Sequence, residues 1–389
     1  MLLSFSVSGF GSIQQPIEMS LEPFYRQRIS GTKYEKNYIQ NGHDRVAKSV
    51  IIFGNNASGK TNLLLALNFS VNLIVGDILF NPQRKTRGRT LADIVKTYLN
   101  RFSEVMTFEL EVADEKDAYK YAISLRPSGV LEESLTKNDR VIYEYAEDKL
   151  HFPGSGEIEE IYSVPSSIPL LHKLNDFIPD MATKFRGLIG EIEVDIPGAF
   201  NTDGKWSDLA VSRFGKQLIE QHQEQALAVL QTIDPTISEI AFQPISDADG
   251  EERYTPSYHR KRNGEDHIFP FAAESQGVKK ITGLLVSLLG VLDDKRTFVV
   301  DEFDSSISTR SLLQIYRSLV HSDLNSQGQL IVTSHDLTLL DMDVFAASQV
   351  YVIYKTEKLG SVMHSLGDFN LRSDKKRLAM RFLRGDFEV

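Results

Sequence analysis

The sequence contains no cysteine in its 389 residues. This absence excludes disulfide bonds and every metal site that depends on thiolate ligands. No apolar run is long enough to cross a bilayer, so we expect neither a transmembrane helix nor a membrane partner. The first residues alternate like a strand and have no basic region before their apolar positions, so we also expect no export signal and a cytoplasmic location.

Acidic residues outnumber basic ones, 53 to 43. The formal net charge of −10 argues against a protein whose whole surface coats nucleic acid. Basic residues still form three clusters, which are Arg84, Lys85, Arg87 and Arg89; His259, Arg260, Lys261 and Arg262; and Lys375, Lys376, Arg377, Arg381 and Arg384. Each cluster fits a solvated loop or helix face better than a nucleic-acid contact, but together they leave a local basic groove open.

One stretch that is present fits a phosphate-binding loop at every defined position, namely Gly54-Asn55-Asn56-Ala57-Ser58-Gly59-Lys60-Thr61. The glycines let backbone N–H groups surround a phosphate, Lys60 can reach the β- and γ-phosphates, and the Thr61 hydroxyl can bind Mg²⁺. An apolar run at 50–53 predicts a strand before the loop, and an apolar segment beginning at Asn62 predicts a helix after it. This setting disfavours a chance match, and we expect ATP and Mg²⁺ to bind here.

Two later strands end in residues that suit the same chemistry. The apolar run at 297–300 leads directly into Asp301 and Glu302. We predict that Asp301 holds Mg²⁺ and that Glu302 polarises the water that attacks the γ-phosphate. The run at 329–333 leads to His335, which we expect to hydrogen-bond the γ-phosphate. The alternative for each of these residues is an ordinary surface or core role.

The order of the patterns predicts an α/β fold, with strands and helices alternating around a mostly parallel core sheet. Period-2 alternation at 107–112, 119–125 and 141–145 predicts an antiparallel β meander. Helical spacing then dominates between about Pro165 and Pro235, and an earlier polar stretch from Pro23 to Lys48 predicts a long loop. We therefore divide the chain into an N-terminal part of the head (1–164), a helical insertion (165–235) and a C-terminal part of the head (236–389).

These motifs together resemble a known superfamily. Glu274-Ser275-Gln276-Gly277 before a helix, the Asp301-Glu302 pair and His335 resemble the signature motif, Walker B and switch histidine of ABC-type ATPases. Ser275 follows Lys60 by 215 residues, a spacing that resembles the SMC, RecF and OLD group rather than transporters. The loop through Asn62 and the ending from Lys375 to Gly385 are similar to stand-alone bacterial abortive-infection ATPases of the RloA/AbiL-like and PARIS types.

The resemblance implies a P-loop ABC-type ATPase head that works as a homodimer or larger oligomer. In this arrangement two heads enclose ATP, and Ser275, Gln276 and Gly277 of one copy complete the site that contains Lys60 of the other. Only 54 residues follow His335, so we expect no nuclease domain and a separate effector protein, such as a nuclease, in anti-phage defence. The main alternative is a RecF/SMC-like ATP-gated protein that binds DNA in repair, and a non-hydrolysing scaffold is a further one.

Overall fold

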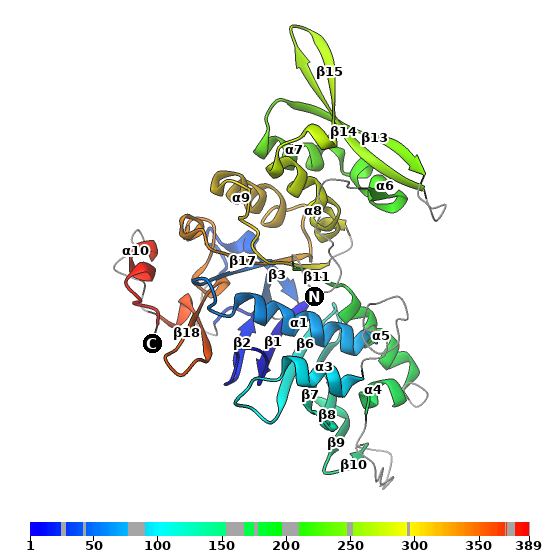
Figure 1. Cartoon of the computed structure of the whole chain (residues 1–389), viewed down its shortest axis with the longest axis vertical. Helices are drawn as coiled ribbons and strands as arrows, with labels where there is room; N and C mark the ends of the chain where they lie inside the picture. The colour runs from blue at the N-terminus through cyan, green and yellow to red at the C-terminus, as the bar shows by residue number, and fades with distance from the viewer. Residues whose placement is uncertain are drawn as a thin grey trace.

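The computed structural model describes residues 1–24, 29–41, 44–76, 90–152, 167–174, 178–196, 210–246, 252–293, 296–369, 371 and 378–388. The predicted α/β fold is confirmed, with a six-stranded core sheet at its centre (Figure 1). In spatial order its strands are β11 (Ile192–Asp195), β16 (Thr297–Val300), β17 (Gln329–Ser334), β5 (Ser49–Phe53), β18 (Val350–Lys355) and β19 (Ser361–Ser365). Neighbours from β11 to β18 run parallel, and β19 pairs with β18 antiparallel.

Strand β5 lies inside this sheet between two strands that come much later in the chain. Leu330 of β17 pairs with Ser49, and Val350 of β18 pairs with Ile51. Every residue of β5 is buried. A parallel strand covered on both faces is expected to be continuously apolar, which explains why the sequence shows a run rather than an alternation here.

One face of the core sheet packs on a large mixed layer. This layer contains α1 (Lys60–Val75), α5 (Pro179–Gly190) and a seven-stranded antiparallel sheet, which share one hydrophobic core with Val50 and Ile52 of β5. In spatial order the antiparallel strands are β10 (Lys149–His151), β9 (Arg140–Ala146), β8 (Gly129–Lys137), β7 (Ala118–Arg126), β6 (Met106–Ala113), β1 (Leu2–Ser8) and β2 (Ile17–Ser20). Two further helices, α3 (Leu91–Tyr98) and α4 (Leu170–Lys173), belong to the same half. The predicted meander is therefore present, and β8 is an additional strand within it.

The other face packs on helices. Ile51 and Phe53 of β5 join a second hydrophobic core, which therefore lies across the sheet from α1. Its helices are α6 (Arg213–Gln221), α7 (Gln223–Ile233), α8 (Gln276–Asp293), α9 (Thr309–Ile315) and a π-helical turn (Tyr316–Val320). Alternate side chains of one strand thus serve two cores.

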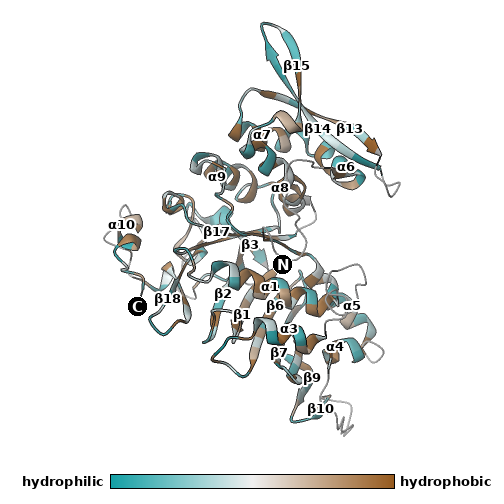
Figure 2. Cartoon of the chain, in the orientation of Figure 1, coloured by the Kyte–Doolittle hydropathy of each residue, from teal (hydrophilic) through white to brown (hydrophobic). Residues whose placement is uncertain are grey.

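A small sheet lies beyond these helices. It is made of β12 (Val211–Ser212), β13 (Ile237–Ser246), β14 (Glu252–Arg262) and β15 (Glu265–Pro270). The β14–β15 hairpin forms one end of the molecule in Figure 1, and its outer part is mostly hydrophilic in Figure 2. The basic cluster at 259–262 lies at the end of β14 in this sheet.

Two expectations need correction or extension. The stretch from Pro23 to Lys48 is not only a loop, because it contains a 3-10 turn (Glu35–Asn37) and the paired strands β3 (Tyr38–Asn41) and β4 (Asp44–Ala47). The segment 165–235 contains the expected helices but also β11, so the chain returns to the core sheet within the range we assigned to an insertion. Our boundaries between parts of the chain remain an interpretation.

The remaining elements are short. They are 3-10 turns at Phe271–Ala273, Leu337–Leu339, Ala347–Gln349 and Leu366–Asp368, and helix α10 (Leu378–Leu383). Among the described residues, the helices are too short or too polar for any of them to cross a membrane.

Candidate functional site

The predicted phosphate loop joins β5 to α1. The helix begins at Lys60, two positions before Asn62, where we predicted its start. Gly59 precedes it with a φ of 115°, and an added Cβ there would lie 2.3 Å from Ser361 Oγ. Ala57 also has a left-handed φ, of 63°. The loop therefore curls tightly before a helix N-terminus, whose first N–H groups have no intrahelical acceptors and suit an anion.

A chain of polar side chains holds the loop in place. The Asn62 amide donates to Ser12 Oγ (2.8 Å), and Ser12 and Ser361 hydroxyls lie 2.7 Å apart. The Ser361 hydroxyl in turn donates to the Ser58 carbonyl (2.7 Å). We predicted Asn62 as a nucleotide contact; in this structure its amide braces the loop through the turn after β1 and through β19.

The loop fits a phosphate-bearing ligand. Ser58 Oγ is buried without a hydrogen-bond partner among the described residues. The loop therefore contains a hydroxyl that a phosphate oxygen could satisfy. Lys60 is also buried, and its Nζ donates to the carbonyls of Gly54 (2.6 Å) and Asn55 (3.1 Å). Burial lowers the pKa of Lys60, and the nearby Asp301 and Glu302 carboxylates oppose that shift. Phosphate oxygens are stronger acceptors for such an ammonium than neutral carbonyls.

The two predicted magnesium ligands lie side by side. Thr61 Oγ1 donates to Asp301 Oδ2 at 2.7 Å, and Asp301 is buried at the end of β16. Thr333, at the adjacent end of β17, donates its hydroxyl to the other oxygen of Asp301. A hydroxyl and a carboxylate are the oxygen ligands that Mg²⁺ prefers, so this pair fits the expected ion.

Glu302 has an unusual backbone. Its φ is 50°, a left-handed conformation that costs a non-glycine residue on the order of 1–2 kcal/mol. The backbone is held from two sides, since its N–H donates to Thr333 Oγ1 (2.8 Å) and its carbonyl accepts from Lys280 Nζ (2.7 Å). The side chain is 52% exposed. Glu302 therefore presents its carboxylate to solvent from a fixed backbone.

His335 connects Glu302 to the phosphate loop. Its Nδ1 lies 3.3 Å from Lys60 Nζ, and its Nε2 lies 3.6 Å from Glu302 Oε1. An ammonium can only donate, so Nδ1 accepts and the ring proton of neutral His335 lies on Nε2, facing Glu302. The structure thus brings the predicted Lys60, Thr61, Asp301, Glu302 and His335 to one edge of the core sheet.

Three residues at this edge escaped the sequence analysis. Thr333 connects Asp301 to Glu302, Lys280 holds the Glu302 carbonyl, and Asp304 accepts the backbone N–H groups of His335 (3.1 Å) and Asp336 (3.0 Å). Thr333 and Asp304 had a usable signal, because Thr333 lies at the end of β17 and Asp304 lies in the turn that follows β16, and these two strands were already expected to meet. Lys280 lies within a helix and follows no predicted strand, so no sequence pattern marked it as a site residue.

The predicted signature residues lie elsewhere. Helix α8 begins at Gln276 and belongs to the second core, across the sheet from α1. Ser275 and Gln276 are exposed. Among the described residues, no hydrogen bond or ion pair joins Ser275–Gly277 to the loop at Gly54–Thr61. Within the described part of one chain, the Ser275–Gly277 turn therefore makes no polar contact with the phosphate loop.

An ion-pair network supports the residue before Ser275. Arg260 of β14 makes two bonds to the Glu274 carboxylate (2.7 and 2.8 Å) and one from Nη2 to Asp234 Oδ2 (2.7 Å). Glu274 and then Asp234 raise the pKa of Arg260, against the effect of burial. His259 also pairs with Asp266 at 2.5 Å. Two members of the basic cluster at 259–262 are therefore engaged within the protein.

The other two basic clusters cannot be placed as surfaces. Arg84, Lys85, Arg87 and Arg89 lie outside the described residues, as do Lys375, Lys376 and Arg377. Arg381, in α10, pairs with Asp386 at 3.2 Å.

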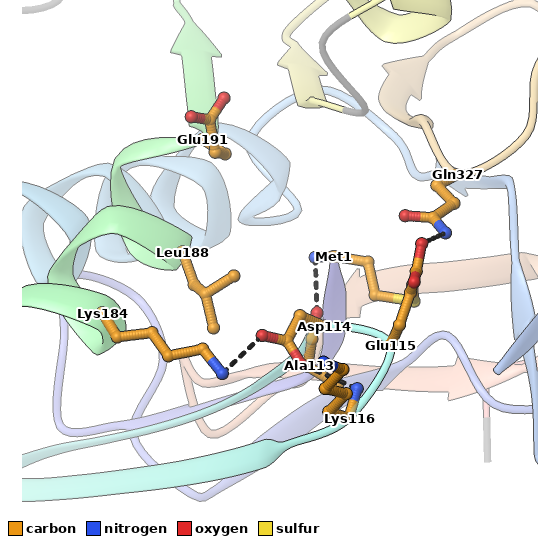
Figure 3. A pocket seen from close by; sticks show the side chains of 9 residues that line it. All are labelled: Met1, Ala113, Asp114, Glu115, Lys116, Lys184, Leu188, Glu191 and Gln327. Atoms are coloured by element: carbon orange, nitrogen blue, oxygen red, sulfur yellow. Dashed lines mark hydrogen bonds and ion pairs between the residues drawn. The ribbon is translucent and has the colours of Figure 1, made fainter. Parts of the chain in front are cut away.

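A cavity of about 440 Å³ lies apart from the candidate site (Figure 3). Met1, Asp114, Lys184, Glu191 and Gln327 are among its lining residues. The Lys184 ammonium forms an ion pair with Asp114 at 2.8 Å, and the Met1 amino group donates to the Ala113 carbonyl. None of the predicted site residues lines this cavity, so it is not part of the nucleotide site.

Comparisons with known proteins point to a family. The family model described as "AAA domain, putative AbiEii toxin, Type IV TA system" matches residues 49–341. No curated protein matches the chain. Similar solved structures include an Smc head bound to the C-winged helix domain of ScpA (11% identity, TM-score 0.46, 94% of this chain and 98% of that chain). A second is the SMC head domain from Thermotoga maritima, with 12% identity and a TM-score of 0.42 over 94% of this chain and 98% of that chain. A third is the Pyrococcus furiosus Smc head with an extended coiled coil bound to the C-terminal domain of ScpA, with 11% identity and a TM-score of 0.42 over 99% of each chain.

Proposed function

The chain belongs to the AAA-domain family described as "AAA domain, putative AbiEii toxin, Type IV TA system", and from this premise we propose that it hydrolyses ATP at sites completed by a second copy. We further propose that this ATPase controls a separate effector protein in anti-phage defence. The family membership supports an ATPase of the AAA type; hydrolysis, the shared site and the effector are the proposal.

The residues at the sheet edge support the chemistry. Lys60 provides a positive charge for the β- and γ-phosphates, and Glu302 orients the attacking water with its exposed carboxylate. His335 carries its Nε2 proton beside Glu302 and donates it in a hydrogen bond to the γ-phosphate. A magnesium ion held by Thr61 and Asp301 would neutralise phosphate charge. The chain's own contribution is to hold these groups in fixed relation to one another.

One observation carries the proposal of a shared site. The loop at Gly54–Thr61 leads into α1 and the turn at Ser275–Gly277 leads into α8, two helices that pack on opposite faces of one sheet, and Ser275 and Gln276 are exposed. Ser275 and the first N–H groups of α8 form an anion-binding helix end that no group of the same chain's phosphate loop contacts. A second copy facing the first would bring its own Ser275 turn to the nucleotide held by Lys60.

Mixing two damaged forms tests the shared site. Lys60→Ala removes phosphate binding but leaves the Ser275 turn intact, and Ser275→Arg blocks the turn but leaves the loop intact. We expect each variant alone to hydrolyse ATP at least 10-fold more slowly than wild type, because no site is complete. An equimolar mixture should recover a substantial fraction of wild-type activity, because each mixed pair contains one complete site.

Two outcomes would contradict the shared site. One is a mixture that stays as inactive as its components although both variants still pair. The other is wild-type turnover per chain that does not rise with protein concentration. Native molecular mass with and without ATP supplies the necessary measure of pairing.

Support for the effector is of a different kind. The family description names a toxin system. The β14–β15 hairpin also exposes two apolar side chains that a partner protein could cover, Ile268 (58% exposed) and Phe269 (39% exposed). Co-purification with ATP, from cells that carry the neighbouring genes, should retain a specific protein such as a nuclease. Retention of duplex DNA that salt releases steeply would instead support the RecF/SMC-like alternative. The exposed Lys261 and Arg262 would then be its first contacts to examine.

A further inference from the structure

A buried lysine connects the exposed signature turn to the candidate catalytic glutamate. Lys280 lies in α8, one turn after Gly277, and only 8% of it is exposed. Its Nζ donates to the backbone carbonyl of Glu302 at 2.7 Å. A buried ammonium needs compensation, and Asp304 and Asp195 supply most of it by opposing the effect of burial on the pKa of Lys280.

The start of α8 touches the same backbone segment at a second point. A Cβ added to Gly277 would lie 2.8 Å from the carbonyl oxygen of Ser306, so only glycine allows this approach. Ser306 itself has a left-handed φ of 66°. The turn that follows β16 is therefore in contact with α8 at both ends, through Lys280 at Glu302 and through Gly277 at Ser306.

This contact matters because the Glu302 conformation is strained. On one side the Glu302 N–H is fixed to Thr333, which belongs to the rigid core sheet. On the other side its carbonyl is fixed to Lys280, which belongs to the helix that begins at the signature turn. A shift of α8 that moves Lys280 Nζ pulls on the carbonyl of the peptide after Glu302, next to the Cα that carries the catalytic candidate side chain.

We propose that Lys280 is a positioning residue that makes the orientation of Glu302 depend on engagement of the Ser275 turn of the same chain. The inference rests on the proposed shared site. In a pair, the Ser275 turn of one copy meets the nucleotide held by the other, whereas Glu302 acts on the nucleotide held by its own Lys60. Lys280 thereby couples the two sites, and each copy reaches its full rate only when its partner is also loaded.

The test compares Lys280→Met with Lys279→Met. The two changes remove the same charge from adjacent residues of one helix, but Lys279 donates to the Ala272 carbonyl and lies over the Phe271 ring, and no described hydrogen bond joins it to Glu302. We expect Lys280→Met to lower kcat at least 10-fold, with nucleotide Kd within about twofold and ATP-induced pairing retained. We expect Lys279→Met to keep kcat within about twofold.

A second readout does not depend on activity. In wild type, nucleotide-induced pairing should slow amide hydrogen exchange in the segment 301–306, because the backbone of Glu302 becomes more firmly held. Lys280→Met should abolish this response while pairing persists, and Lys279→Met should keep it. A role confined to neutralising nearby carboxylates would change thermal stability without removing the exchange response.

The outcomes separate this proposal from the one on which it rests. If wild type shows no ATP-induced pairing, the shared site fails. If wild type pairs but Lys280→Met matches Lys279→Met in kcat and in exchange, only the role of Lys280 is overturned. If Lys280→Met does not fold, Lys280→Arg is measured in the same assays, since it keeps the charge but changes the donor geometry. Reduced kcat with a weakened exchange response supports the proposal, and wild-type values in both overturn it.

Discussion

The two faces of the core sheet carry different kinds of structure, a braced phosphate loop on one and an exposed turn on the other. On the face of α1, the phosphate loop is tied to the turn after β1 and to β19 by consecutive hydrogen bonds through Asn62, Ser12 and Ser361. On the face of α8, the Ser275 turn is exposed and is supported from behind by Arg260 through Glu274. The first region is held by hydrogen bonds within one chain, and the second presents exposed residues on a firm support.

Under the proposed shared site, one sheet carries a binding site on one face and a contact for a second copy on the other. The loop must be pre-organised, because a cradle that has to form on binding loses affinity to conformational entropy. The Ser275 turn must be rigid yet accessible, and an ion-pair network behind an exposed turn satisfies both conditions. The comparison predicts that substitutions near the phosphate loop lower turnover, whereas substitutions behind the Ser275 turn lower stability.

The largest effect should follow from Glu302→Gln on the side of the phosphate loop. We expect turnover to fall roughly 100-fold or more, because a neutral amide is a poor base, while nucleotide affinity changes by less than about threefold. Phosphate release and fluorescent-nucleotide titration measure the two quantities. Glu357→Gln, an exposed glutamate after β18, is the matched control and should behave as wild type. Normal turnover in Glu302→Gln would remove the catalytic assignment of this residue.

A smaller effect, and one of another kind, should follow from Arg260→Met on the opposite side. The change leaves the Glu274 carboxylate, only 5% exposed, without its guanidinium partner. We expect the free energy of unfolding to fall by about 2–3 kcal/mol, because an unpaired buried charge is costly. Denaturant titration provides the measurement. Nucleotide affinity should stay near the wild-type value, because the loop is braced independently.

Arg262→Met is the control for that change. Arg262 lies at the end of the same strand and is exposed, so its replacement should alter stability by less than about 0.5 kcal/mol. Equal effects of the two changes would mean that the network does not support the turn, and the contrast between the two faces would lose its physical basis.

Local patterns were sufficient for much of the central architecture. The apolar run at 297–300 coincides with β16, and the run at 329–333 falls within β17. The carboxyl ends of parallel strands meet at one edge, so the motifs also predicted that Asp301 and His335 would approach the phosphate loop. Here sequence order and strand chemistry determine the placement.

The parts that sequence reasoning missed depend on distant partners. Strand β11 is a short alternating segment that follows α5, and only its pairing with β16 identifies it as part of the core sheet. Arg260 appeared to be one of four basic residues on a solvated hairpin, yet it lies between Asp234 and Glu274. No periodicity reports such long-range ion pairs, and none reports a hydrogen bond from Lys280 to a backbone carbonyl.

The position of β5 has a consequence for synthesis of the protein. Its partner β17 begins at Gln329, so the strand that ends in the phosphate loop emerges from the ribosome about 280 residues before its neighbour. At roughly 5–20 residues per second, β5 waits some tens of seconds without its sheet. A strand with four consecutive apolar residues exposed for that time is open to aggregation, so we expect the nascent chain to depend on early shielding, either by its own N-terminal half or by chaperones. The ability to bind nucleotide is therefore among the last properties that this chain acquires.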